Sequence, residues 1–250
     1  MRTNIGKLTY EKMGELINRS YNSIQSKIRY LPFKKKIKKH RVNSDFFKNW
    51  SPEMSYILGF IAADGNICHS GRAHTLHVAS DDKDAIEKIK RVLNYCGPIY
   101  QKSRFNGKTS HSLRICDQII FNDLKKLGIT ERKSLSLFPK VRKAFVADFL
   151  RGFLDGEGSV YLRNIKYPSK LVVVFYTASK SMAEFLHLNL KKILGNNNFS
   201  TIQSRITKYK NPYYSISLGH KASCKLYSKL YRNTRLYMDR KYNKFIQGMT

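Results

Sequence analysis

Two short stretches of sequence decide the fold of this chain: ILGFIAADG at residues 57–65, and LRGFLDGEG at residues 150–158, which begins 93 residues later. Both place two small residues four positions apart, Gly59 with Ala63 and Gly152 with Gly156. On an α-helix, residues at this spacing lie on one face, one turn from each other. The sequence therefore predicts two helices whose backbones pack directly against each other.

An acid closes each of these predicted helices, Asp64 in the first copy and Glu157 in the second. Helices packed through their small-residue faces would bring the two carboxylates together. Because carboxylates repel each other and a helix C-terminus already carries partial negative charge, the pair needs a cation. Mg²⁺ suits it, since Mg²⁺ prefers oxygen ligands and keeps positions for water and phosphate. The glycines that follow, Gly65 and Gly158, would let the chain leave each helix and begin a strand.

The composition indicates an anionic partner. Lysine and arginine total 47 against 17 acids, so the net charge is +30, and nucleic acid is the leading candidate. Two carboxylates on so basic a chain suggest metal-dependent hydrolysis of a phosphodiester. No apolar run approaches the roughly 20 residues that span a bilayer, which leaves peripheral binding to an anionic membrane as a minor alternative. The N-terminal residues lack the apolar stretch of a secretion signal, so an intracellular protein is expected.

The four cysteines are far apart and form no CxxC pair, which argues against a zinc site or a disulfide framework. We expect four buried free thiols.

The pattern around each nonapeptide is the same, which predicts two tandem repeats. Each repeat reads as αββαββα, an α+β fold with antiparallel sheets, over residues 50–145 and 146–250. Ser51 and Pro52 open the first helix of the first repeat. Later helices are expected to end at three glycines: Gly97, Gly128 and Gly195.

The N-terminal residues 1–33 resemble a helix-turn-helix, since residues 8–18 and 21–31 are amphipathic and Ser20 can cap the second helix. Its exposed side would carry Asn22, Gln25 and Arg29 toward DNA. An amphipathic hairpin that only packs on the main body is the structural alternative. Residues 34–49 form a basic linker, which could lie along phosphates or serve as a solvated tail or a localisation signal.

The two nonapeptides and the pattern that follows each make residues 50–250 resemble the LAGLIDADG homing endonucleases in their single-chain, two-repeat form. The resemblance implies that the motif helices form a pseudo-symmetric interface and that the sheets form a saddle over the major groove of double-stranded DNA. It further implies a monomer that acts as a pseudo-dimer and cuts both strands of a long site, leaving short 3′ overhangs. Mg²⁺ is the expected cofactor, with Mn²⁺ as a substitute.

The resemblance assigns roles by motif position. Asp64 and Glu157 are the catalytic, metal-binding acids, whereas Asp155 is at most a supporting residue. Lys133 and Lys241, late in each repeat, would lie near the scissile phosphates. Ser80 and Ser179 are weaker candidates for residues that orient water.

The strands offer side chains for DNA, because alternate residues of a strand share one face. The candidates, in chain order, are Arg72, His74, His77, Gln101, Arg104, Arg114, Arg163, Lys166, Gln203, Arg205 and Lys208.

Two other functions fit the same sequence. One is an RNA maturase that assists splicing of the intron encoding it, with intron RNA as a partner. The other is a DNA-binding regulator that does not cleave. Retention of both acids favours DNA cleavage. A freestanding or intron-encoded mobile endonuclease is expected, because the splice-junction features of an intein are lacking, and a bacterial or phage-host cytoplasm or an organelle matrix fits it.

Overall fold

A computed structural model describes residues 9–29, 40–71, 73–104, 107–131, 137–165, 167–195, 201–206, 211–232 and 234–249. Helices α1 (Tyr10–Leu16) and α2 (Tyr21–Arg29) come first. The first repeat contains α3 (Pro52–Asp64), β1 (Gly65–Ser70), β2 (Ala73–Ser80), α4 (Lys83–Val92), β3 (Tyr100–Ser103), β4 (Thr109–Cys116) and α5 (Gln118–Lys126). The second contains α6 (Val146–Glu157), β5 (Ser159–Ile165), β6 (Tyr167–Thr177), α7 (Lys180–Leu194), β7 (Gln203–Ile206), β8 (Pro212–Leu218) and α8 (His220–Leu230). A short 3₁₀ helix (Lys143–Phe145) precedes α6, and α9 (Asp239–Gln247) follows the second repeat.

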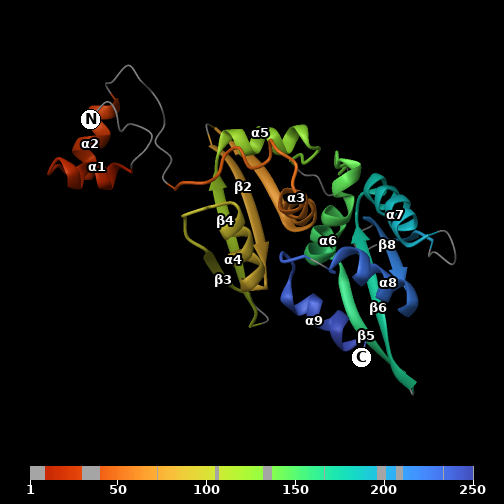
Figure 1. Cartoon of the computed structure of the whole chain (residues 1–250). Helices are drawn as coiled ribbons and strands as arrows, with labels where there is room; N and C mark the ends of the chain where they lie inside the picture. Colours follow the sequence, from red (N-terminus) through yellow and green to blue (C-terminus); the bar gives the residue numbers. More distant parts are fainter. Residues whose placement is uncertain are drawn as a thin grey trace.

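Each repeat builds one antiparallel four-stranded sheet, in the order β1-β2-β4-β3 and β5-β6-β8-β7. The identical order confirms the predicted α+β fold of two αββαββα repeats. One face of each sheet packs on helices and on a continuous hydrophobic core that runs through both repeats. Figure 1 shows α3 and α6 side by side between the two sheets.

Helices α3 and α6 are in direct backbone contact, as the small residues predicted. A Cβ atom on Gly59 would overlap the carbonyl oxygen of Phe149, and one on Gly152 would overlap the carbonyl oxygen of Tyr56. The two contacts correspond to each other, because Gly59 and Gly152 hold the same position in the two repeats, as do Tyr56 and Phe149. The helix pair is therefore a pseudo-symmetric interface that only glycine permits at these two positions.

The chain leaves both helices through glycine for a steric reason. Gly65 and Gly158 have extended backbones, with φ of −86° and −79°, which any residue can adopt. A Cβ on Gly65 would come within 2.7 Å of Ile61, and one on Gly158 within 2.7 Å of the carbonyl oxygen of Leu154. Glycine is needed here for close approach to the preceding turn, and not for a left-handed conformation.

Most predicted helix ends are confirmed, with one correction. The chain turns with positive φ at Gly128, two residues after the end of α5, and at Gly195, directly after α7. In contrast α4 ends at Val92 and not at Gly97, because Asn94 takes the left-handed conformation with φ of 48°. Asparagine tolerates this region better than most residues.

Two further expectations need correction. Helix α9, over Asp239–Gln247, was not foreseen in the repeat pattern. The cysteines are free, but Cys68, Cys96 and Cys116 are exposed and only Cys224 is partly buried.

The N-terminal helices α1 and α2 form a pair with a small core of its own, made by Met13, Ile24 and Ile28. The hydroxyl of Ser20 accepts a hydrogen bond from the Ser23 amide at 3.3 Å, which is the predicted cap. Asn22 and Gln25 are exposed, as expected, whereas the side chain of Arg29 lies outside the described residues. Among the described residues no helix is long and apolar enough to cross a membrane.

Candidate active site

The two motif acids lie at neighbouring helix ends. Asp64 is the last residue of α3 and Glu157 the last of α6, and both side chains are exposed. Between them, Gly156 packs against the side chain of Ala63, and a Cβ on Gly156 would lie 3.6 Å from the Asp64 amide nitrogen. The small-residue face therefore brings the C-terminal ends of α3 and α6 together, as the spacing predicted.

These residues fit a magnesium ion that is held partly by its substrate. No cluster of three His, Cys, Asp or Glu side chains that could hold a metal occurs among the described residues. Two exposed carboxylates at adjacent C-termini provide negative charge and oxygen donors but leave most coordination positions to other ligands. Mg²⁺ commonly binds in this way, with water and phosphate oxygens completing its shell.

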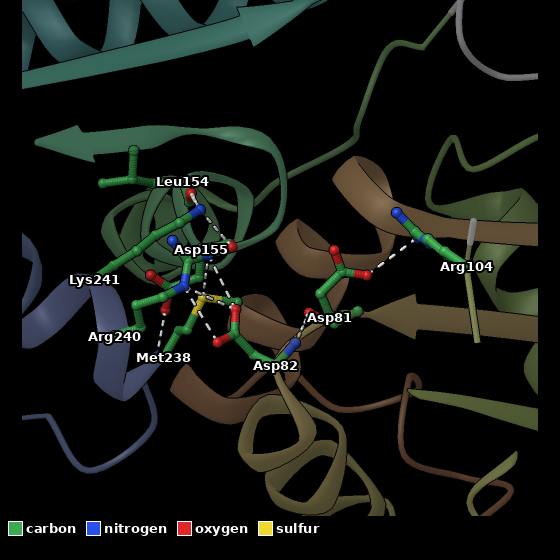
Figure 2. Close-up of polar contacts among 9 residues, drawn as sticks. Asp81, Asp82, Arg104, Leu154, Asp155, Met238, Arg240 and Lys241 are labelled. Carbon is green, nitrogen blue, oxygen red and sulfur yellow. Dashed lines mark hydrogen bonds and ion pairs between the residues drawn. The ribbon is translucent and has the colours of Figure 1, made fainter. Parts of the chain in front are cut away.

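A small pocket of about 230 Å³ lies beside Asp64 and Gly156. Two aspartates and two arginines line it as ion pairs (Figure 2). Arg104 contacts Asp81 at 3.2 Å, and Arg240 contacts Asp82 at 3.0 Å. Sequence reasoning assigned Arg104 only to DNA contact and missed Arg240, because Arg240 reaches this pocket from the opposite repeat. Both guanidinium groups stand where a phosphate near Asp64 could bind.

Lys241, predicted beside the scissile phosphate, is buried against the end of α6. Its Nζ donates to the carbonyl oxygens of Leu154 and Asp155, both at 2.6 Å (Figure 2). Burial lowers the pKa of Lys241 to about 8, although the charges of Asp155 and Asp64 oppose the shift. The lysine thus places a cation on the partial negative charge of the helix end, two residues before Glu157.

Asp155 is fully buried and fixes the C-terminal segment of the second repeat. Its carboxylate accepts hydrogen bonds from the hydroxyls of Tyr56 at 2.9 Å and Tyr231 at 2.7 Å. It also accepts one from the Met238 amide at 2.9 Å. Burial raises the pKa of Asp155, and these hydrogen bonds and Lys241 counteract the rise. The supporting role expected for Asp155 is therefore that of a connector between α3, α6 and the residues before α9.

The other predicted residues of the site differ in placement. Ser80 lines the pocket beside Asp64, and its hydroxyl accepts a hydrogen bond from the Asp82 amide at 3.2 Å. Ser179 caps α7 and donates to the carbonyl oxygen of Leu137 at 2.9 Å, so its hydroxyl is occupied in the core. Lys133 lies outside the described residues.

The strand register assigns side chains of the first sheet to its two faces. Leu76 and Val78 are buried in the core, so His77 between them faces the other way, across from Arg114 on β4. The guanidinium of Arg114 lies 5.5 Å from the ring centre of Tyr100 on β3. Burial and the charge of Arg114 lower the pKa of His77. His77 and Arg114 therefore share the face that α4 and α5 leave open.

Two other candidates do not share that face. The ring of His74 packs 4.9 Å from Phe121 of α5, which is on the helix-covered side. Gln101 pairs with His111, which lies three positions from Arg114 on β4 and therefore on the other face of the sheet. Gln101 thus also lies opposite the open face. Alternation already places His74 and His77, three positions apart on β2, on opposite faces of the sheet. Burial and strand pairing then show which of the two faces the helices cover.

In the second sheet three candidates share the open face. Arg163 pairs with Lys170, Gln203 with Ser215, and Arg205 with Tyr213. All three candidate side chains are exposed. The register adds further side chains to the open faces that sequence reasoning missed: Tyr100, Lys102, Tyr161, Lys170 and Tyr176. The remaining candidates, Arg72, Lys166 and Lys208, lie outside the described residues.

A comparison with protein families and with curated proteins gives two matches of interest. A family model described as LAGLIDADG-like domain matches residues 51–133 and 144–237, once on each repeat. The chain is also 29% identical to the uncharacterized protein MJ0398 of Methanocaldococcus jannaschii. The aligned region has 178 residues and covers 69% of this chain. The match covers 64% of that relative, so the chain spans less than two thirds of its length.

Solved structures with a similar fold include two DNA complexes. The homing endonuclease I-WcaI, bound to its DNA recognition sequence, matches with a TM-score of 0.56 and 17% identity, covering 88% of this chain and 97% of that one. The I-LtrWI LAGLIDADG homing endonuclease, bound to target DNA, matches with a TM-score of 0.50 and 14% identity, covering 83% and 91%. At these identities the likeness concerns the fold. Since the family model covers most of both repeats, the chain belongs to the family of proteins with LAGLIDADG-like domains.

Proposed function

We propose that the protein is a site-specific DNA endonuclease that uses a divalent metal to break both strands of a long target, leaving short 3′ overhangs. The observation that supports the proposal is the placement of two exposed acids, Asp64 and Glu157, at the adjacent C-terminal ends of two helices in backbone contact. The open faces of the two sheets, with His77, Arg114 and Arg205, provide a surface for the flanking DNA.

In this proposal the residues of the chain act mainly by position and charge. Asp64 and Glu157 would hold Mg²⁺, which would stabilise negative charge developing on the phosphate. Arg104 and Arg240 would exchange their aspartate partners for phosphate oxygens, since guanidinium groups bind phosphate in two-pronged fashion. Lys241 would hold the end of α6, and so the backbone of Glu157, in a fixed place.

The proposal is tested with the substitutions Asp64→Asn and Glu157→Gln. The wild-type chain first selects its bound sequence from a library of random duplexes. Cleavage of that sequence is then measured with Mg²⁺, with Mn²⁺ and with EDTA, and the product ends are mapped by sequencing. We expect each substitution to reduce cleavage at least about a hundredfold. Glu184→Gln, an exposed acid on α7, is the matched control and should cleave normally.

Binding measured beside cleavage separates this proposal from that of a DNA-binding regulator. Both active-site variants should retain the selected duplex with nearly wild-type affinity, because each only removes negative charge near phosphates. A wild-type chain that binds the duplex but never cuts it, in any metal, would instead indicate a DNA-binding regulator. Cleavage that survives both substitutions would refute the assignment of the acids.

A further inference from the structure

A second cavity lies at the opposite end of the helix pair from the acids. Its volume is about 600 Å³, and the first turns of α3 and α6 line it with Pro52 and Ala147. Helix α3 has 13 residues. At 1.5 Å per residue, its two ends are about 20 Å apart. The cavity is therefore separate from the pocket beside Asp64 and from the metal site proposed there.

The cavity is strongly basic. Six of its lining side chains are lysine or arginine, and two are acidic. Two of the six are already paired: Arg151 with Asp148 at 2.8 Å, and Lys88 with Asp239 at 2.6 Å. The other four are exposed and form no ion pair within the described part of the chain: Arg91, Lys229, Arg232 and Arg235. Cations gathered around one cavity without acidic partners repel each other, so an anion would stabilise them.

Apart from Thr234, the rest of the lining is apolar. Leu230 and Leu236 are buried, and Val92 is partly buried beside them. A basic rim over an apolar wall matches a ligand with a flat, weakly polar portion and phosphate groups. The volume is within the range of small-molecule and cofactor sites. It suits one nucleotide, whereas a DNA duplex presents its phosphates on a convex surface that does not enter such a cavity.

We propose that this cavity is a nucleotide-binding site, in which arginines bind the phosphates and the apolar wall contacts the base. Two ligands have this chemistry, in which a base is joined to phosphate groups: a free nucleoside triphosphate, and an unpaired nucleotide of a nucleic-acid strand. The site acts independently of the candidate active site, and either proposal can fail without the other.

The test measures binding of fluorescent probes to the full chain by polarisation. The probes are the four nucleoside triphosphates and single strands of ten nucleotides, as RNA and as DNA, with a 5′ phosphate. An excess of unlabelled duplex DNA occupies the sheet surface throughout. The cavity variant carries Arg91→Ser, Arg232→Ser and Arg235→Ser. The matched control removes three exposed charges elsewhere, with Lys191→Ser, Lys192→Ser and Lys221→Ser.

We expect the cavity variant to bind its probe at least about tenfold more weakly, since losing even one charge-assisted hydrogen bond has this effect. The control should stay within about threefold of wild type. Binding of triphosphates identifies a free nucleotide, and binding of strands alone identifies an unpaired one. Arg235→Ser alone repeats the test if the triple variant melts early. The proposal is overturned if wild type binds no probe, or if cavity variant and control weaken binding equally.

Discussion

At the scale of single residues, the second motif contains a buried carboxylate that the first motif lacks. Asp155 stands where the first motif has Ala62, and it is surrounded by hydroxyl and amide donors. A buried carboxylate without such donors is very unfavourable. The difference makes the two halves of the site chemically unequal, although their helices and glycines match.

Lys241 leads to a prediction about pH. Its pKa is about 8 in the folded chain, against 10.5 for an ordinary lysine. Between these values the unfolded chain binds a proton that the folded chain has lost, so stability due to this residue rises with pH. The difference in unfolding free energy, wild type minus Lys241→Met, should therefore increase above pH 8, by up to about 1.4 kcal/mol per pH unit.

Urea unfolding at pH 6 to 10 measures this difference. It should be flat below pH 7, where both states are protonated. A difference that stays constant up to pH 10 would show that the buried ammonium keeps its proton.

The sequence predicted the placement of the two acids at helix ends better than it predicted the residues around them. Asp64 and Glu157 follow from spacing within one helix, which is local information. Lys241 contacts carbonyl groups 86 and 87 residues away, and no local pattern encodes such a contact. His74 and Gln101 were proposed without regard to the face of the strand they occupy, and only the strand register together with burial shows that both face away from the open surface.

At the scale of elements, the contact between α3 and α6 predicts an unusual cost for a small substitution. Alanine normally favours a helix over glycine by about 1 kcal/mol. At Gly59 a methyl group would overlap the backbone of α6, and overpacking costs typically about 1–3 kcal/mol and sometimes more. Because the overlap is with backbone, we expect Gly59→Ala to lower the free energy of unfolding by about 3 kcal/mol.

The matched control is Gly219→Ala, where nothing lies within 4 Å of the added Cβ and φ is −71°. It should change stability by no more than about 0.5 kcal/mol in the same urea experiment. Equal effects of the two substitutions would mean that the helices separate enough to accept a side chain.

The ends of the helices show which structural features the sequence predicts and which it does not. Gly128 and Gly195 end their helices because glycine takes positive φ without strain. The end of α4 at Val92, where Asn94 turns the chain, and the existence of α9 were missed. Asparagine is a weaker stop signal than the glycine three residues later, and α9 lies beyond the duplicated pattern that guided the prediction.

At the scale of the whole molecule, the N-terminal helices predict a change in salt dependence. The first 40 residues include the pair α1 and α2 and the basic stretch KKKIKKHR at residues 34–41, apart from its last arginine. If they contact phosphates, their removal should weaken DNA binding and flatten its dependence on salt, because fewer counterions are released. Binding of the selected duplex across a salt series measures both quantities.

The pair α1 and α2 has a core separate from that of the repeats, so the truncated chain should still fold. The double substitution Asn22→Ala and Gln25→Ala in the full chain tests whether α2 reads bases. It should weaken binding without changing the salt slope, since neither residue is charged. Unchanged binding after truncation would rule out a role for this segment on DNA.

Expressed as separate polypeptides, the two repeats would recognise each other in preference to themselves. In the intact chain the Tyr56 hydroxyl reaches Asp155 across the interface. Phe149 is the equivalent of Tyr56 in the second repeat, so in a pair of second repeats Phe149 would lie opposite each Asp155. Ala62 is the equivalent of Asp155 in the first repeat, so in a pair of first repeats Ala62 would lie opposite each Tyr56. Either self-pairing leaves a buried polar group without this partner, and only the mixed pair satisfies both. This hydrogen bond thus favours the pairing of two different repeats. Separately expressed fragments would therefore associate as the natural heterodimer.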